Sequence, residues 1–199
     1  MEVFSVLKFY IVLIILISVL VGCAPESIKD EDSYQIPPLL TDELGEDMKE
    51  VEVFTDVMQR DGQFPEKVVV DTNYYSSNEV SRGDLVQVNI PADQAAEYSQ
   101  GNPGSHVVRV VALPGETVKA EEGQLYVDEA ELETFYGSAY RWAGGSSAEQ
   151  TTDFSMPEFT VPESSFLLSG DNWWRSPVNI AISPIPREFI VGKVIGYIK

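Results

Sequence analysis

The hydrophobic pattern divides the chain into an apolar start and a long region of short, β-branched runs. Residues 9–21 contain one clearly polar side chain, Ser18. From residue 67 onward, apolar runs of a few residues alternate with turn signals that contain Gly, Pro, Asn and Ser. Short strands with such punctuation predict an all-β sandwich or barrel-like domain over residues 67–199.

The predicted strands cover residues 67–70, 84–90, 106–113, 116–119, 124–127, 165–168 and 189–198. Residues 133–158 interrupt this pattern, because they are polar, rich in small residues and dotted with aromatic ones. We expect them to form an insertion or a long hairpin on the surface.

The apolar start is an export signal or an anchor. The hydrophobic region of a signal peptide spans roughly 7–15 residues and a membrane-spanning helix needs about 20, so this run fits either. The motif LVGC, which ends at Cys23, resembles a bacterial lipoprotein signal, in which acyl chains on the cysteine replace the removed helix. Residues 1–23 are therefore a lipoprotein signal peptide with lipidation at Cys23, or an uncleaved anchor with an incidental cysteine. Both interpretations place residues 24–199 on the extracytoplasmic side of the cell membrane or envelope.

The chain as a whole is strongly acidic. The chain carries 13 Lys and Arg against 32 Asp and Glu, a net charge of −19. Nucleic acid would be repelled, so we expect no nucleic-acid partner.

Residues 24–66 hold a large share of the acidic side chains, and they contain the pair Pro37-Pro38. We predict an acidic linker, with a short amphipathic helix over residues 41–60 or a flexible segment in its place.

The scarcity of cysteine and histidine limits the chemistry. The chain has one cysteine and one histidine, His106. This count rules out an internal disulfide and a zinc site of the Cys/His kind, so we predict no metal and no cofactor.

Three blocks of the β region follow one another along the chain. They read SRGDLVQV at 81–88, VRVVALPGETV with GQLYV at 108–127, and VPE, LSGDN, Ser176 and IPREFIVGKV at 161–194. Together and in this order they resemble type I signal peptidase, the serine peptidase that trims signal peptides at the membrane surface. The resemblance implies a signal-peptidase-like β domain.

The family works by a Ser–Lys dyad, in which a lysine whose pKa is lowered by desolvation takes the proton of the serine. The resemblance places the lysine position at Val108 and the serine position at Tyr75, eight residues before Gly83. Valine has no titratable group. The retained family positions are Arg109, Gly170, Asp171, Asn172 and Ser176, whereas Trp173, Val178 and Ile180 replace polar residues. The pattern predicts a pseudo-peptidase that binds peptides or docks onto an envelope or secretion protein.

Two alternatives remain open. Ser76 and Ser77 directly follow the serine position, and His106 lies two residues before the lysine position, on the same face of the predicted strand. Because some relatives use histidine as the base, His106 with Ser76, Ser77 or Ser105 would make an active peptidase with a rearranged dyad. The other alternative is a structural envelope lipoprotein that reuses the fold. Trp173 and Trp174 either line a rim that faces peptide or lipid, or fill the volume of lost polar residues.

Overall fold

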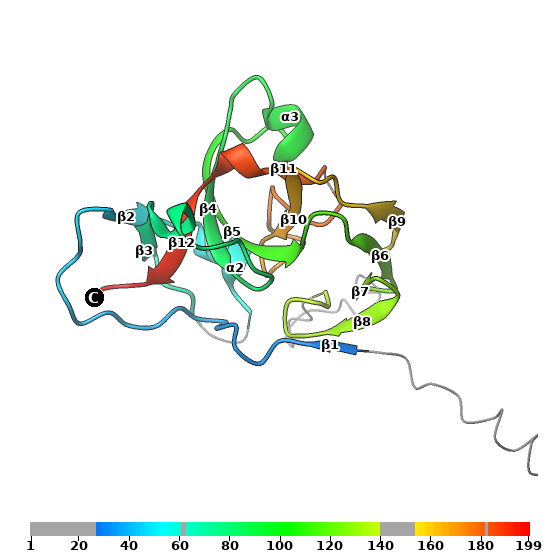
Figure 1. Ribbon diagram of the computed structural model, residues 1–199, viewed down its shortest axis with the longest axis horizontal. Helices are drawn as coiled ribbons and strands as arrows, with labels where there is room; N and C mark the ends of the chain where they lie inside the picture. The colour runs from blue at the N-terminus through cyan, green and yellow to red at the C-terminus, as the bar shows by residue number, and fades with distance from the viewer. Residues whose placement is uncertain (1–26, 61–62, 140–153, 182) are drawn as a thin grey trace, which may run out of the picture.

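The computed structural model describes residues 27–60, 63–139, 154–181 and 183–199. Within these residues the strands form two sheets (Figure 1), with the orders β1-β8-β7-β6-β9 and β11-β10-β5-β4-β12-β3-β2. The smaller sheet contains β1 (Ser27–Lys29), β6 (Thr117–Glu121), β7 (Gln124–Val127), β8 (Ala130–Glu133) and β9 (Met156–Thr160). The larger sheet contains β2 (Met48–Glu52), β3 (Lys67–Asp71), β4 (Leu85–Ile90), β5 (Gly104–Ala112), β10 (Ser165–Ser169), β11 (Ile185–Pro186) and β12 (Ile190–Gly196).

The helices among the described residues are short. They are α2 (Thr55–Met58), α3 (Ala95–Tyr98) and the 3-10 turns η1 (Tyr74–Ser76) and η2 (Arg187–Phe189). The all-β prediction is therefore confirmed, and β7 has the predicted bounds. The strands that the sequence pattern did not predict are β1, β2, β8, β9 and β11, which are at most five residues long.

Strand β5 lies at the centre of the packing. It pairs with β4 on one side and with β10 on the other, and its residues from Val107 to Ala112 are buried. Because side chains alternate along a strand, Val108 and Val110 belong to one apolar cluster whereas Val107 belongs to another. A strand buried on both faces reads as a continuous β-branched run, which is why this segment was recognisable in the sequence.

Residues 41–60, predicted to be a short amphipathic helix or a flexible segment, contain a strand as well as a short helix. Residues 48–52 form the edge strand β2, which pairs antiparallel with β3, and only α2 is helical. The acidic side chains in β2 point outward, whereas Val51 packs against the apolar cluster around Val68. Pairing with β3, the next strand along the chain, thus overrides the local helical spacing.

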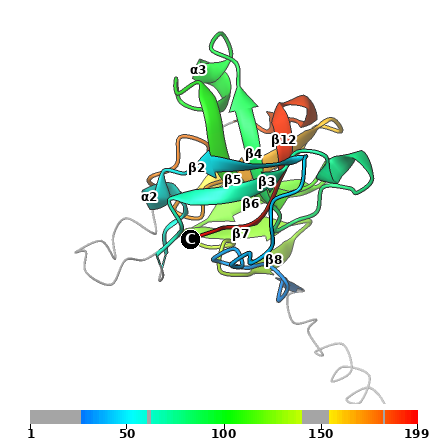
Figure 2. The same cartoon turned by 90° about the vertical axis from the view of Figure 1, so that its left-hand side faces the viewer.

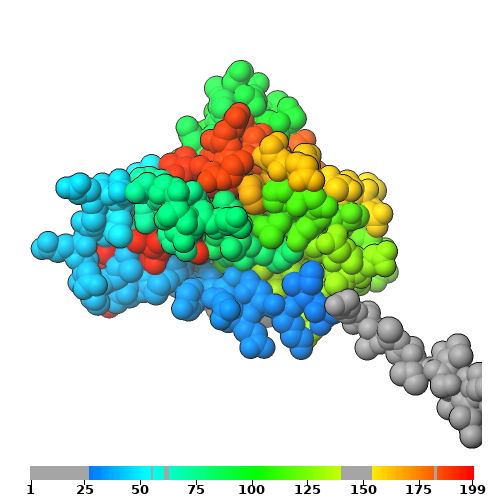
Figure 3. All heavy atoms as spheres, viewed as in Figure 1, coloured from blue at the N-terminus to red at the C-terminus, as the bar shows by residue number. Residues whose placement is uncertain are grey.

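The segment that was expected to be a tether is instead bound along the domain. Residues 27–40, which we call the belt, begin with β1 paired parallel to β8 and end with a bridge between Leu39 and Tyr197. The carboxylate of Asp30 accepts a hydrogen bond of 2.5 Å from the buried Tyr136 hydroxyl. A space-filling view shows the belt, in blue, along the lower face (Figure 3).

Glycine permits the close approach of the belt. Gly83 has a φ of +84°, and a β-carbon there would lie 1.8 Å from Ser33 Oγ and 2.3 Å from Asp30 Oδ2. The Gly-Asp turn was recognisable in the sequence, but its contact with the belt was not. A side chain at this position would therefore displace the belt as well as strain the turn.

The segment 133–158, predicted to be an insertion or a long hairpin on the surface, is described only at its two ends. Tyr136 is buried, the amide of Leu125 donates to Gly137 O, and the amide of Ala139 donates to Gly123 O. Strand β9 then pairs with β6. These ends extend the smaller sheet and its core. Residues 140–153 lie outside the described residues.

A buried guanidinium joins the belt to the rest of the domain. Arg109 is 1% exposed; its Nε donates to Asp171 Oδ1 at 2.7 Å and its Nη2 to Asp171 Oδ2 at 2.8 Å. It also donates to Gly83 O at 2.8 Å and to Tyr34 O at 3.0 Å. One side chain thus connects β5, the loop after β10, the turn before β4 and the belt.

Replacing Arg109 tests how much this side chain contributes to the stability of the fold. Arg109→Met leaves the buried Asp171 carboxylate without its partner, so we expect the free energy of unfolding to fall by about 3–5 kcal/mol. Urea unfolding of the full chain in detergent micelles measures the change. The matched control is Lys29→Met, because Lys29 and Glu133 form a pair whose side chains are 60% and 55% exposed. We expect that control to change stability by less than about 1 kcal/mol, and equal losses in both variants would contradict the account.

Candidate functional site

Val108, the residue that the resemblance assigns to the family's lysine position, lies in the middle of β5. Val108 is fully buried and pairs with Val86 of β4. It belongs to an apolar cluster formed by Val86, Val88, Ile90, Ala95, Val108, Val110, Phe166, Leu168, Val178, Ile185, Phe189 and Ile190. An aliphatic side chain at this position can neither accept nor donate a proton.

The serine position lies against the same cluster. Tyr75, in η1, packs its ring against the cluster that contains Val108, and its hydroxyl donates a 2.9 Å hydrogen bond to Asp84 Oδ2. Burial and the charge of Asp84 raise the pKa of Tyr75, so the phenol stays protonated. The structure therefore brings the two family positions to one apolar region, as the resemblance implies, but with side chains that cannot form a nucleophile–base pair.

The two serines that follow Tyr75 are directed elsewhere. Ser76 Oγ donates to Asn73 O at 2.7 Å, and Ser77 Oγ accepts from Asn78 Nδ2 at 3.3 Å. Both line a cavity of about 260 Å³ beside β2, whose described lining does not include His106. The structure thus does not bring His106 together with Ser76 or Ser77.

A lysine that the sequence analysis missed lies near η1. Lys193 Nζ is 2.6 Å from Asp84 Oδ1 and 3.4 Å from the Tyr74 hydroxyl. Burial opposes its charge, but the hydrogen bond and the charge of Asp84 outweigh burial, so the pKa of Lys193 is raised. A general base must give up its proton near neutral pH, and this ammonium holds it.

His106 lines a different and larger cavity. Its Nε2 is 2.8 Å from Asn102 O, and since a carbonyl only accepts, Nε2 carries the proton. Burial lowers the pKa of His106, although the hydrogen bond to Asn102 opposes the shift. Ser105 and Ser176 line the same cavity, but Ser105 Oγ accepts from Gln87 Nε2 at 2.8 Å and Ser176 Oγ donates to Val178 O.

This cavity measures about 680 Å³ and has an aromatic wall. Phe54, Phe154, Trp173 and Trp174 line it. Phe54 is 73% exposed and Trp174 is 46% exposed, whereas Trp173 is 1% exposed and belongs to the core. The sequence left open whether the two tryptophans line a rim or fill volume in the core. Trp173 fills volume in the core, and Trp174 lies at the rim of the cavity.

Polar groups complete the lining of the cavity. They come from Asp56, Gln100, Asn102, Ser105, His106, Arg175, Ser176 and Asn179. Amides and a neutral imidazole can donate and accept hydrogen bonds, which suits the backbone of a peptide. Phe54 and Phe154 were missed because each is a single aromatic residue in a segment that the sequence assigned to the acidic linker or to the insertion.

The retained third block has a structural role in this fold. Ser176 Oγ accepts from the Gly170 amide at 3.2 Å, and the Asn172 amide donates to Val57 O at 2.9 Å. A β-carbon on Gly170 would lie 2.5 Å from the Val57 side chain. The block therefore holds α2 against the loop after β10, while Asp171 binds Arg109.

The described residues contain no group of three or more His, Cys, Asp or Glu side chains placed to hold a metal ion. Among the same residues, no helix is long and apolar enough to cross a bilayer. Cys23 and the apolar run at 9–21, which carry the predicted lipidation site and anchor, lie outside them.

Comparison with known proteins decides the family. The family model described as "Signal peptidase, peptidase S26" matches residues 47–198. The chain belongs to this family. The match begins one residue before the strand β2 and covers Tyr75 and Val108, the residues at which the resemblance expects the dyad.

Parts of the chain are similar to individual signal peptidases. Signal peptidase I of Leptolyngbya laminosa is 25% identical over 130 residues, which are 65% of this chain and 58% of that protein. Signal peptidase I V of Bacillus subtilis is 34% identical over 93 residues, which are 44% of this chain and 54% of that protein. The chain thus spans a little over half the length of these relatives. A crystal structure of a signal peptidase I from Enterococcus faecalis aligns with a TM-score of 0.39 and 21% identity, over 59% of this chain and 97% of that chain.

The protonation of His106 gives a direct test of the site. Because burial lowers its pKa, we expect the single histidine signal to titrate in NMR spectra with a midpoint below the usual value of about 6.5. The unfolded chain then binds this proton more readily than the folded one, so stability falls as the pH drops from about 6.5 through the folded pKa. A midpoint above 6.5 would show that His106 gains a charged partner and would contradict the geometry.

Proposed function

We propose that this signal peptidase relative is a membrane-tethered, extracytoplasmic domain that binds peptide segments or docks onto a secretion or envelope protein, without Ser–Lys catalysis. The observation that carries the proposal is the fully buried Val108, which occupies the lysine position within an aliphatic cluster. Loss of a catalytic base or nucleophile costs roughly 10⁴ to 10⁶ in rate.

The large cavity supports binding of a peptide. Its volume of about 680 Å³ falls within the range of roughly 300–1,000 Å³ that is usual for ligand sites. Phe54 and Trp174 offer apolar contact at the rim, and Gln100, Asn102 and Asn179 offer amides. Because the chain carries a net charge of −19, a basic segment would approach it fastest.

The membrane tether rests on the N-terminal sequence and on the family. An acylated Cys23, or an uncleaved helix over residues 9–21, would hold the domain at the outer side of the membrane. Whether Cys23→Ala abolishes acylation, measured by metabolic labelling with a fatty acid, distinguishes these two anchors.

An active peptidase with His106 as base is the second candidate. One observation favours it: a histidine kept neutral by burial lines the same cavity as Ser105 and Ser176. The hydrogen bonds described above oppose it, because the Ser105 and Ser176 hydroxyls already have partners other than His106. A structural envelope lipoprotein, the third interpretation, would show neither turnover nor binding.

A turnover assay separates the first two candidates. We expect the full chain in detergent micelles to cleave a signal-peptide substrate no faster than the matched detergent blank. Single His106→Ala, Ser76→Ala and Ser77→Ala variants serve as controls for any residual rate. Cleavage by the wild-type chain that any of these substitutions abolishes would overturn the proposal in favour of the rearranged dyad.

A binding assay tests the role of the cavity. Trp174→Ala removes the exposed indole from its rim, so we expect the affinity for a basic, extended peptide to fall about tenfold, or about 1.4 kcal/mol. Fluorescence anisotropy of a labelled peptide measures this change. Tyr126→Ala, on β7 of the smaller sheet and outside the cavity lining, is the control and should leave the affinity unchanged. Equal losses in both variants, or no binding by the wild-type chain, would count against a peptide site here.

A further inference from the structure

The belt carries three of the six exposed large apolar side chains among the described residues, and a fourth follows it closely. The four are Tyr34 at 65%, Ile36 at 39%, Leu39 at 42% and Leu44 at 36%. Side chains of this kind gathered on one segment indicate a surface that contacts another apolar phase.

The same stretch is free of charge. Residues 33–41 contain no Asp, Glu, Lys or Arg in a chain whose net charge is −19, whereas residues 30–32 and 42–43 on either side are acidic. Acidic groups are repelled by an anionic leaflet, so an uncharged stretch is the part of such a domain that tolerates the closest approach to lipid.

The belt is held in place by its backbone. Arg109 donates to Tyr34 O at 3.0 Å, the Tyr197 amide donates to Pro38 O at 2.9 Å, and the Leu40 amide donates to Tyr197 O at 2.8 Å. Pro37 is buried while the side chains of Ile36 and Leu39 on either side are exposed. The apolar side chains are therefore presented outward by a preformed surface.

The belt follows the predicted membrane anchor closely in the sequence, which favours lipid as the phase that its exposed side chains contact. Three residues separate Cys23 from the start of β1, and three residues span at most about 10 Å. With either anchor, the belt thus begins within reach of the lipid headgroups. Tyrosine is enriched where a membrane meets water, and Tyr34 is the most exposed of the four side chains.

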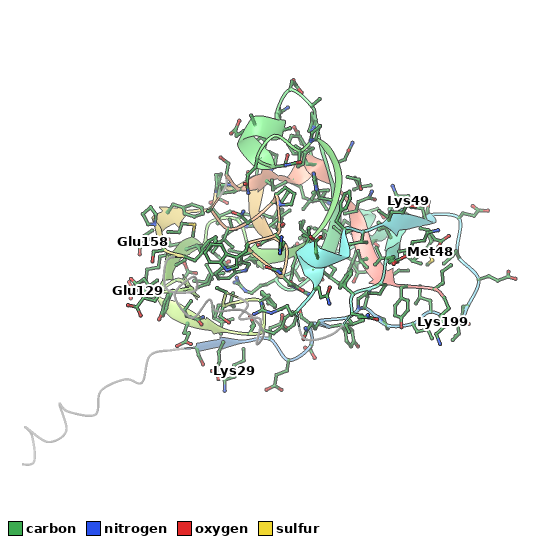
Figure 4. The ribbon with its side chains drawn as sticks, turned by 180° about the vertical axis from the view of Figure 1, so that it is seen from behind. Lys29, Met48, Lys49, Glu129, Glu158 and Lys199 are labelled. Carbon is green, nitrogen blue, oxygen red and sulfur yellow. The ribbon has the colours of Figure 1, made fainter. Side chains whose placement is uncertain are left out.

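We propose that the belt face, residues 33–41, lies in the bilayer interface and sets the orientation of the domain on the membrane. This inference rests on the membrane tether proposed above. Lys29, within the belt, and Lys199 both lie along the lower edge of the molecule in Figure 4, where they would meet phosphate groups. The belt and α2 lie on different sides of the body (Figure 2), and Phe54, which directly precedes α2, lines the large cavity. The belt also precedes the part that matches the family model, which begins at residue 47.

Quenching by brominated lipid tests the orientation. The full chain is reconstituted in phosphatidylcholine vesicles with or without brominated acyl chains, and Tyr34→Trp is compared with Phe54→Trp. These positions are similarly exposed, at 65% and 73%, but lie on the belt and at the cavity. After subtraction of the wild-type emission, we expect the added indole at position 34 to be quenched at least about twofold and the one at position 54 to be unaffected.

The possible outcomes separate this inference from the proposed tether. Co-sedimentation with the vesicles and quenching at position 34 alone support the belt face. Co-sedimentation with quenching at position 54 alone, at both positions or at neither overturns the orientation and leaves the tether intact. Failure of the full chain to sediment with vesicles overturns both. In a second variant, Ile36→Ser with Leu39→Ser on the Tyr34→Trp background, quenching should fall while sedimentation persists, because the anchor is unchanged.

Discussion

The fold depends on one buried cation, the guanidinium of Arg109. It forms a two-point ion pair with Asp171, and its remaining hydrogen bonds reach Gly83 and Tyr34. The rings of Phe135 and Tyr136 lie 4.7 Å and 5.3 Å from it. A charge without solvent is tolerated only when its donors are paired, so the loop after β10, the Gly-Asp turn and the belt must all remain in place together. This requirement makes Arg109, Asp171 and Gly83 structural residues of the fold, whatever side chain occupies the position next to the arginine.

Two neighbouring residues of β5, Val108 and Arg109, point to opposite faces of the strand. The groups on each face determine whether a charged side chain can be buried there. Arg109 lies on the face where partners for its charge are present, whereas Val108 lies on the face that packs against Val86 and other aliphatic side chains. An amine there would need either a hydroxyl partner or a lowered pKa to remain buried. Tyr75 supplies neither, because its hydroxyl is held by Asp84 and its ring fills the adjacent space. The apolar cluster thus extends over the region where a dyad would operate, and the candidate binding surface lies in another cavity.

Sequence patterns predicted the elements whose signals are local. The buried run of β5 and the turn before β4 were recognisable from β-branched residues and glycine, and the resemblance located the positions of Val108 and Tyr75. The belt and β2 could not be predicted from local patterns, because their structure comes from pairing with other segments. The belt pairs with β8 and Tyr197, which are far along the chain, and β2 pairs with β3. The cavity escaped prediction for a related reason: Phe54, His106 and Trp174 come from three separate segments that only tertiary packing brings together.

Covalent trapping tests most directly whether this domain has a working nucleophile. The full chain in detergent micelles is incubated with a signal-peptide analogue that carries an acylating group at the cleaved position, and its intact mass is measured. The account predicts an unmodified mass, because no serine hydroxyl among the described residues is hydrogen-bonded to a neutral lysine or histidine side chain. A single acyl adduct that maps to one serine, and that disappears when His106 or Lys193 is replaced, would contradict it.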